Sequence, residues 1–143
     1  MSCIACDTVG PGGVIAETDY WLVDHTIGAL GVGTLIVKPK RHVLHVADLT
    51  EVEASELGPL LRRVSAAVTA LVRPEQVYVT LWSHAEAMPG HIHFVVQPVT
   101  RERMDAFDGS YGLRLQIRMF DRGQPPDPDA AAAFAAAARG LLR

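Results

Sequence analysis

The sequence predicts an α+β domain built on a mostly antiparallel sheet. Short runs rich in β-branched residues, at 34–37, 77–81 and 91–99, are separated by turn residues, as strands commonly are. One long segment instead has apolar residues at helical spacing, namely Leu57, Leu60, Leu61, Val64, Val68 and Leu71. With 143 residues the chain can bury a core without disulfides, so we expect one domain over residues 1–143.

The first strands are predicted from extended, apolar-rich segments. Residues 14–24 read as two short extended pieces around a turn at residues 18–19. The run at 34–37 is bounded by Pro39, which favours the end of a strand. Residues 82–90 have the composition of a loop and end in Pro89-Gly90, so the strands at 77–81 and 91–99 are expected on either side of it.

The long helix has a clear start signal. Thr50 as N-cap and Glu53 three residues later form a capping box. Pro59 lies inside the apolar pattern, and a proline there removes a helical hydrogen bond. The regular helix is therefore expected either to begin near Pro59 or to be kinked there.

The last part of the chain is less regular. Residues 101–126 are polar and mixed, and a strand is predicted at 113–119. Residues 127–142 are rich in alanine, which has the highest helix propensity, and predict a helix capped by Asp127 or Asp129. We expect this helix at the surface or at a dimer edge.

Charge and hydropathy exclude some classes of function. The net charge of −3 argues against strong binding of nucleic acid through its phosphates. No apolar run approaches the roughly 20 residues that span a bilayer, and the N-terminus lacks the pattern of a secretion signal, so we expect a cytoplasmic protein without a membrane partner. The one basic cluster is read as a solvated strand end or, alternatively, a local anion site: Lys38, Lys40, Arg41 and His42.

Cys3 and Cys6 form a C-x-x-C motif. A structural disulfide is not expected in a reducing compartment, and a redox C-x-x-C follows a strand in a βαβ unit, which is not the pattern here. The two cysteines are therefore half of a zinc site or unrelated to each other. Six histidines are available to complete such a site: His25, His42, His45, His84, His91 and His93.

The segment at 91–97 carries the clearest chemical signal. Because side chains alternate along a strand, one face is apolar and the other carries two imidazoles about 7 Å apart. A neutral imidazole is a nucleophile toward phosphorus and a metal ligand, so a functional site is predicted on that face. The apolar face holds Ile92, Phe94 and Val96, and the other holds His91, His93, Val95 and Gln97.

The motifs, taken in order, resemble those of the histidine-triad (HIT) family over residues 1–100, whereas the extension at 101–143 adds nothing to the match. The resemblance implies a HIT-like fold, with a mostly antiparallel sheet of about five strands, a long helix and a C-terminal helix, usually in a homodimer. The matching motifs are Cys3-Ile4-Ala5-Cys6, Asp24 after an apolar strand, the run from Gly33 to Val43 with Pro39-Lys40-Arg41-His42, Leu49-Thr50 before the helix, and His91-Ile92-His93 followed by Pro98.

A structural zinc ion is implied by the same resemblance. Its ligands are the two cysteines, the histidine of the Pro-Lys-x-His motif and the first histidine of the triad. Four protein ligands close the coordination sphere of zinc, which is typical of a structural site. These positions are Cys3, Cys6, His42 and His91; His45 is an alternative to His42, or simply an exposed residue.

The implied activity is that of a nucleotide-phosphate hydrolase or nucleotidyl transferase. In the family the middle histidine attacks the α-phosphate of a nucleotide, and this position is His93. Asp24 matches the aspartate that meets the ribose. The expected ligand is a purine nucleotide or nucleotide conjugate. Further predicted substrate contacts are Leu22, His25, Ser83, His84 and Gln97.

Three departures from the family pattern weaken the expected catalysis. The third histidine of the triad is Val95, and the polar pair of the preceding loop is replaced by Ala87 and Met88. Losing one transition-state donor commonly costs about 10²- to 10³-fold in rate, unless Ser83, His84 or Gln97 compensates. The alternatives are a nucleotide-binding or regulatory module with little turnover, and a zinc hydrolase with an open metal position. Trp21 and Trp82 are expected to stack on a base or to pack in the core.

Overall fold

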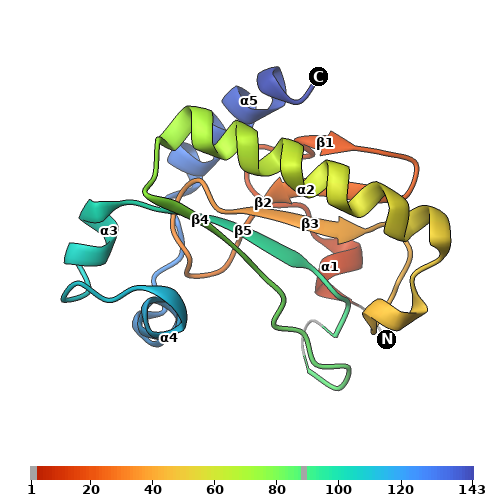
Figure 1. Ribbon diagram of the computed structural model, residues 1–143, viewed down its shortest axis with the longest axis horizontal. Helices are drawn as coiled ribbons and strands as arrows, with labels where there is room; N and C mark the ends of the chain where they lie inside the picture. The colour runs from red at the N-terminus through yellow and green to blue at the C-terminus, as the bar shows by residue number, and fades with distance from the viewer. Residues whose placement is uncertain (1–2, 88–89) are drawn as a thin grey trace.

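One antiparallel sheet organises the described part of the chain. The structure is a computed structural model that describes residues 3–87 and 90–143. The strand order is β1-β2-β3-β5-β4, and each neighbouring pair is antiparallel (Figure 1). The predicted α+β fold with a five-stranded sheet is therefore confirmed. The strands are β1 (Ala16–Glu17), β2 (Trp21–His25), β3 (Leu35–Pro39), β4 (Gln76–Thr80) and β5 (Phe94–Val99).

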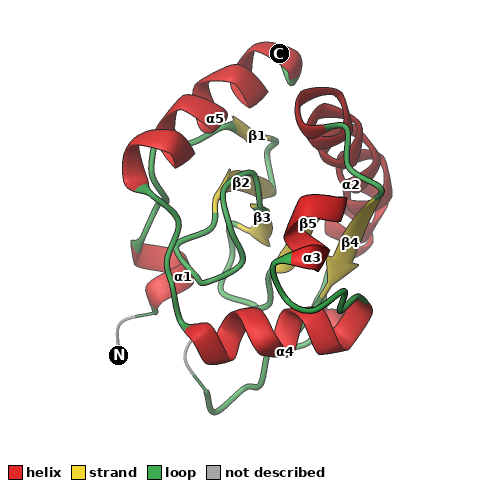
Figure 2. Ribbon diagram, turned by 90° about the vertical axis from the view of Figure 1, so that its left-hand side faces the viewer, coloured by secondary structure: helices red, strands yellow, loops and turns green. Residues whose placement is uncertain are grey.

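Helices cover both faces of this sheet (Figure 2). The long helix and the C-terminal helix pack on one face, and two shorter helices after β5 lie near the other. None of the helices within 3–87 and 90–143 has both the length and the apolar character needed to cross a membrane. They are α1 (Ile4–Asp7), the 3-10 turn η1 (Val46–Asp48), α2 (Glu51–Val72), α3 (Arg101–Asp105), α4 (Gly112–Arg122) and α5 (Pro128–Leu141).

Two apolar clusters correspond to the two faces. The larger joins α2 and α5 to the sheet, through side chains such as Leu60, Val64, Ala135 and Val96. The smaller joins α3 and α4 to the opposite face and includes Val95. The predicted alternation along the last strand is thus observed, because Val95 and Val96 belong to different clusters. The remaining members of the smaller cluster are Leu30, Val99, Met104, Phe107, Leu115 and Met119.

Helix α2 begins where the capping box predicts. The Thr50 hydroxyl accepts from the Glu53 amide, and the Glu53 carboxylate accepts from the Thr50 amide. The helix then continues through Pro59 to Val72, so the alternative in which it begins near Pro59 is wrong. Burial of one face against the sheet outweighs the hydrogen bond that Pro59 cannot make.

The strand predicted at 113–119 is wrong, because this segment belongs to α4. Its apolar residues alternate with polar ones, which is the pattern of a strand. The buried residues are instead Leu115, Gln116 and Met119, which is helical spacing, while Leu113 and Ile117 stay exposed. Gly123, with a φ of 63°, ends the helix in the left-handed conformation that glycine adopts most easily.

Helix α5 is part of the core as well as of the surface. Of the two predicted caps, Asp127 and Asp129, the structure has Asp127, whose carboxylate accepts from the Ala130 amide at 2.9 Å. Ala131, Ala135 and Ala138 are fully buried. Small side chains allow this helix to approach the sheet and α2 closely, which explains the alanine-rich composition.

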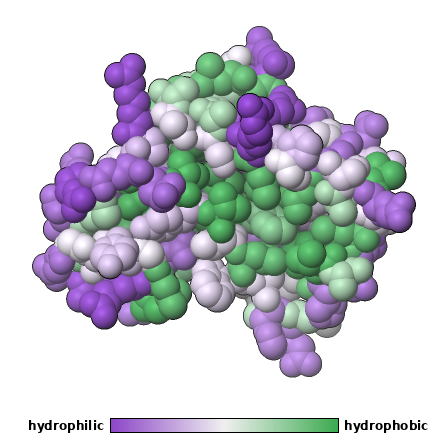
Figure 3. All heavy atoms as spheres, viewed as in Figure 1, coloured by the Kyte–Doolittle hydropathy of each residue, from purple (hydrophilic) through white to green (hydrophobic). Residues whose placement is uncertain are grey.

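Several large apolar side chains remain exposed, and apolar areas lie between polar ones on the face seen in Figure 3. Trp82 is the clearest case, with 60% of its surface exposed, so core packing is not its role. Trp21 is completely buried, as the core alternative expects, and its indole N–H donates to the carbonyl oxygen of Glu53.

Candidate active site and metal centre

Four potential metal ligands converge at the N-terminal end of the chain. Cys3 caps the short helix α1 and Cys6 lies one turn later, so both thiols are presented on the same side. The Cys6 Sγ atom is 3.3 Å from Nδ1 of His42 and 3.2 Å from Nδ1 of His91. All four ligand atoms of Cys3, Cys6, His42 and His91 lie within 4.8 Å of one another.

The orientation of His91 suits a metal ligand. Its Nε2 atom lies 2.8 Å from the carbonyl oxygen of Pro39. Because a carbonyl oxygen only accepts hydrogen bonds, Nε2 carries the hydrogen and Nδ1 presents its lone pair to the cluster. Burial lowers the pKa of His91, which favours the neutral ring that binds metal ions.

The donor set fits a zinc ion. Two sulfur and two imidazole donors around tetrahedral zinc are about 3.3–3.8 Å apart. The two distances from Cys6 Sγ, 3.3 Å to His42 and 3.2 Å to His91, are close to this range, and no pair of ligand atoms is more than 4.8 Å apart. Desolvation and then the neighbouring Cys3 thiol raise the pKa of the Cys6 thiol, an effect that a cation held between the four groups would reverse. His45 lies outside this cluster, because its exposed ring contacts Asp48 at 3.3 Å.

A cavity of about 330 Å³ lies beside the cluster on the sheet face that carries His93. The strand register explains why these side chains meet. Asp24, Ile36 and Val95 occupy one row across β2, β3 and β5. Val37 pairs with Phe94, so Lys38 and His93 occupy the next row. The cavity is lined by Ile4, Ala5, Thr8, Gly10, Asp24, His25, Thr26, Ile27, Gly28, Leu30, Ile36, Lys38, His93, Val95 and Phe120.

His93 has one ring nitrogen held by the protein. Its Nδ1 atom lies 3.1 Å from the carbonyl oxygen of His91 and 3.2 Å from the Ser83 hydroxyl. The carbonyl oxygen requires a hydrogen on Nδ1, so Nε2 carries the lone pair. A neutral imidazole in this tautomer, at the wall of a cavity, is competent as a nucleophile.

Asp24 also lines the cavity and is 4% exposed. Its Oδ2 atom accepts from the Gly10 amide at 2.9 Å and from Lys38 Nζ at 3.3 Å. Its Oδ1 atom is buried and has no hydrogen-bond partner among the described residues. Burial raises the pKa of Asp24, and Lys38 opposes this effect. An unpartnered oxygen of this kind is suited to accept from a ligand hydroxyl.

Lys38 is buried, whereas the sequence predicts it as part of a solvated strand end. It is 7% exposed, and its Nζ atom donates to the carbonyl oxygen of Thr8 as well as to Asp24. Lys40 and Arg41 do reach the surface, where they pair with Glu17 and Glu53. Lys38 is buried because the N-terminal segment crosses over it.

The N-terminal segment is held against β2 by a close approach at Gly10. A Cβ atom at this position would lie 1.8 Å from the carbonyl oxygen of His25, so only glycine fits. The Gly10 amide then reaches Asp24. The segment that carries Cys3 and Cys6 therefore also forms one wall of the cavity.

Two predicted substrate contacts have their polar groups engaged by the protein. His25 is buried rather than at the surface; its Nδ1 donates to the carbonyl oxygen of Thr26 and its Nε2 accepts from the Gly33 amide. Burial lowers the pKa of His25 and keeps the ring neutral. Gln97 is fully buried between Leu30, Gln116 and Met119 and does not line the cavity. Gln97 therefore cannot contact a ligand in the cavity in place of the third histidine.

Of the other predicted contacts, only Ser83 lies within hydrogen-bond distance of His93 among the described residues. Ser83 touches His93, whereas Leu22 and the exposed His84 are not among the residues that line the cavity. Of the two loop positions that lack polar side chains, Ala87 is exposed and outside the cavity, and Met88 lies outside the described residues.

Several residues that line the cavity were not predicted as substrate contacts, and Lys38 and Phe120 are two of them. The sequence predicts Lys38 only as part of a strand end or, alternatively, a local anion site; the pairing of Val37 with Phe94 is what places it beside His93. Phe120 comes from α4, a segment that the family resemblance does not cover. No signal in the sequence connects α4 to the site, because its burial depends on tertiary packing.

Known structures share this fold. No protein-family model and no curated protein sequence matches the chain. A zinc-bound histidine-triad family protein from Mycobacterium smegmatis is 21% identical, with a TM-score of 0.68 over 99% of this chain and 94% of that protein. A histidine-triad protein from Bradyrhizobium japonicum is 17% identical, with a TM-score of 0.69 over 91% of this chain and 90% of that one.

A third match is part of a longer protein. The C. elegans NitFhit protein is 18% identical with a TM-score of 0.64; the match covers 90% of this chain but only 27% of that protein. At these identities the matches establish the fold. The resemblance predicted from the motifs is confirmed at that level.

Proposed function

The chain has the fold of the histidine-triad family, and from this premise we propose that it hydrolyses or transfers nucleotide phosphates through His93. The observation that carries the proposal is the contact of 3.1 Å between Nδ1 of His93 and the carbonyl oxygen of His91, from which the tautomer of His93 follows. With Nδ1 held by the His91 carbonyl, the lone pair on Nε2 is available at the wall of a cavity that also contains Asp24 and Lys38.

The proposed reaction has two steps at the α-phosphorus. Nε2 of His93 forms a bond to phosphorus while the bond to the leaving group breaks, and the leaving group takes that electron pair and a solvent proton. Water, or another acceptor, then forms a P–O bond and releases a proton as the P–Nε2 bond breaks. The His91 carbonyl stabilises the positive ring of the intermediate by accepting from Nδ1–H.

The cavity supports a nucleoside as the bound group. The free Oδ1 atom of Asp24 would accept from a ribose hydroxyl, and the Lys38 ammonium would attract the phosphate. Apolar side chains, among them Ile27, Leu30 and Phe120, would pack against the base. The volume of about 330 Å³ lies in the range of small-molecule sites. A purine nucleotide or nucleotide conjugate is the proposed ligand.

Zinc is the proposed metal, held by Cys3, Cys6, His42 and His91. With four protein ligands it would act as a structural cross-link and take no part in the reaction. The cross-link would join the N-terminal wall of the cavity to the backbone of His91, which itself orients His93. In this proposal, zinc would hold the fold together, and the residues of the chain would position the nucleophile.

Turnover of a nucleoside phosphoramidate or a dinucleoside polyphosphate tests the catalytic claim. The wild-type protein should release nucleotide, and His93→Ala should not. His84→Ala is a matched control, because His84 is exposed and lies outside the cavity. Equal rates for the wild-type protein and His93→Ala would remove His93 from the mechanism.

A nucleotide-binding or regulatory module with little turnover is the second candidate. It is favoured by Val95 in place of the third histidine and by the burial of Gln97 under α4. This function predicts that nucleotide affinity measured by calorimetry survives His93→Ala while no turnover is detected in either protein. Absence of affinity for any purine nucleotide would eliminate it.

The cytoplasmic location and the homodimer belong to the same proposal. Strand β4 is at one edge of the sheet, and its Val79 side chain is exposed. An edge strand has unpaired backbone groups that a second copy can bind. A molecular mass near twice 15.5 kDa in solution would support the dimer, and a mass of one chain would contradict it.

A further inference from the structure

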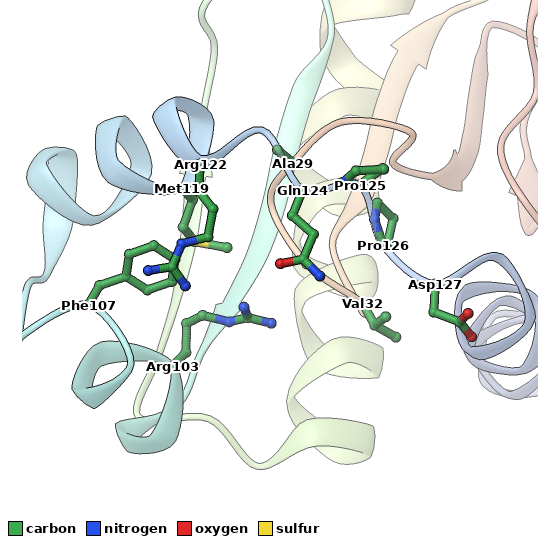
Figure 4. A pocket seen from close by; sticks show the side chains of 11 residues that line it. Ala29, Val32, Arg103, Phe107, Met119, Arg122, Gln124, Pro125, Pro126 and Asp127 are labelled. Atoms are coloured by element: carbon green, nitrogen blue, oxygen red, sulfur yellow. The ribbon is translucent and has the colours of Figure 1, made fainter.

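A second cavity, of about 190 Å³, lies on the other side of the loop between β2 and β3. This loop separates the two cavities, because Ile27, Gly28 and Leu30 line the first and Ala29, Gly31 and Val32 line the second. Figure 4 shows the lining side chains of the second cavity. Beyond the loop they are Arg103, Phe107, Met119, Arg122, Gln124, Pro125, Pro126 and Asp127.

Two arginines face this space. Arg103 belongs to α3 and Arg122 to the last turn of α4. Neither forms an ion pair with the described residues, whereas Arg41, Arg101 and Arg118 each pair with a carboxylate. Two guanidinium groups around one small cavity repel each other, so a bound anion would stabilise the arrangement.

Each guanidinium is positioned by a protein contact. Arg122 lies over the Phe107 ring, with its Cζ atom 4.3 Å from the ring centroid. This stacking uses the face of the guanidinium and leaves its N–H edge free to donate. Arg103 lies against the loop, where a Cβ atom at residue 31 would come within 2.6 Å of its Nη2 atom. Gly31 therefore makes room for this side chain.

The remaining wall limits the size of a bound anion, and its one carboxylate, Asp127, opposes the charge of an anion. The Gln124 amide points toward the arginines in Figure 4. Asp127 lies at the far rim, and its carboxylate accepts from the Ala130 amide as the cap of α5. Met119, Pro125 and Pro126 are apolar, so charges on this side are less screened than in water. The cavity is smaller than the roughly 300 Å³ of drug-sized sites.

We infer that this second cavity binds a small phosphate-type dianion through Arg103 and Arg122. The planar guanidinium fork matches two oxygens of a phosphate, and two such groups match its two negative charges. The inference does not depend on the proposed nucleotide chemistry, because no residue of the second cavity is His93, Asp24 or Lys38. It assigns a separate site on the far side of the β2–β3 loop.

Titration of the isotope-labelled full chain with inorganic phosphate, followed by amide NMR, tests the inference. The amide signals of Gly31, Val32 and Gln124 should shift in a saturable manner. Arg122→Gln should weaken this binding about tenfold or more, and the double variant with Arg103→Gln should abolish it. Arg114→Gln, which removes the same charge from α4 outside the cavity, should bind phosphate like the wild-type protein.

The same spectra separate this site from the nucleotide cavity. Phosphate-induced shifts confined to residues such as Gly10 and His93 would overturn the inference, as would wild-type affinity in the double variant. Thermal unfolding checks that the variants are folded. If Arg103→Gln fails to fold, Arg122→Gln remains decisive, because Arg122 is exposed and its replacement removes no member of either apolar cluster.

Discussion

The ring of His91 belongs to the cluster of four potential metal ligands, and its backbone carbonyl contacts the ring of His93. Its imidazole Nδ1 lies 3.2 Å from Cys6 Sγ, while its carbonyl oxygen lies 3.1 Å from Nδ1 of His93. The ring is locked further by the Pro39 carbonyl at 2.8 Å. One residue therefore connects the four-ligand cluster to the proposed nucleophile, and the metal is expected to act on stability and orientation rather than on the reaction.

Removal of one exposed ligand should separate metal binding from core packing. Cys6→Ala should lose bound zinc and lower the melting temperature by about 5 °C or more, because a bound ion stabilises only the folded state. Metal analysis and thermal unfolding, each with and without a chelator, provide the measurement. A chelator should destabilise the wild-type protein and leave Cys6→Ala unchanged. His45→Ala should keep its zinc; if it loses zinc instead, the ligand assignment is wrong.

The role of Asp24 can be tested by changing the ligand as well as the protein. Asp24→Asn should weaken the binding of a purine nucleoside monophosphate about tenfold or more, since a charged acceptor is lost. The wild-type protein should bind an analogue without ribose hydroxyls more weakly than the natural nucleotide. Asp24→Asn should bind these two ligands with equal affinity. Calorimetry measures both effects. Equal binding of the two ligands to the wild-type protein would contradict a ribose contact.

Asp24→Asn should also reduce stability, because Lys38 then keeps a buried charge without a counter-ion. Breaking a buried pair in this way costs about 3 kcal/mol. The nucleotide experiment is therefore run at a temperature where thermal unfolding shows the variant to be folded.

Restoring the third histidine should speed up turnover. Val95 lines the cavity near His93, so Val95→His would add an N–H donor there and raise the rate about tenfold or more. Val95→Leu changes the volume without adding a donor and should give no increase. Steady-state kinetics with a nucleoside phosphoramidate compares the three proteins. If Val95→His is no faster than Val95→Leu, a missing donor does not limit the rate.

Glu53 should make stability depend on acid. The Arg41 guanidinium and the Thr50 amide lower the pKa of this buried carboxyl from 4.5 to about 2. A lowered carboxyl pKa stabilises the folded state fully above pH 4.5, and this contribution is lost as pH falls from 4.5 through about 2. At neutral pH, Glu53→Gln should cost about 2 kcal/mol in denaturant unfolding.

The difference between the wild-type protein and Glu53→Gln should shrink toward pH 2. Glu51→Gln is the matched control, because Glu51 occupies the same first turn of α2 and is exposed. Its effect should be small at every pH. A constant difference for Glu53→Gln across the acid range would show that its ionisation does not contribute.

Local patterns predicted much of the fold. The β-branched runs became β3 and β4, and the capping box at Thr50 and Glu53 marks the start of α2. These features depend on neighbouring residues, so they are readable from the chain itself. The conformation of the segment at 113–119 was not predicted correctly. Its alternating pattern fits a strand, but its burial is set by the packing of α4 on the sheet.

The site was predictable only in part for the same reason. The cluster of Cys3, Cys6, His42 and His91 followed from the family resemblance, since spacing alone left the ligands open. The sequence predicts a strand from His91, but regular pairing begins at Phe94. Before it, the Ile92 amide donates to the carbonyl oxygen of Val43, between β3 and η1, instead of to a neighbouring strand. Burial of Lys38 and Gln97 depends on segments far away in sequence, the N-terminus and α4.

The covalent step is the centre of the proposed function, and trapping it is the most direct test. The protein is mixed with a nucleoside phosphoramidate, quenched in denaturant at alkaline pH, and digested for mass spectrometry. The proposal predicts a nucleotidyl group on the peptide that contains His93, absent from His93→Ala. Turnover by the wild-type protein with no adduct on this peptide, and undiminished turnover by His93→Ala, would contradict it.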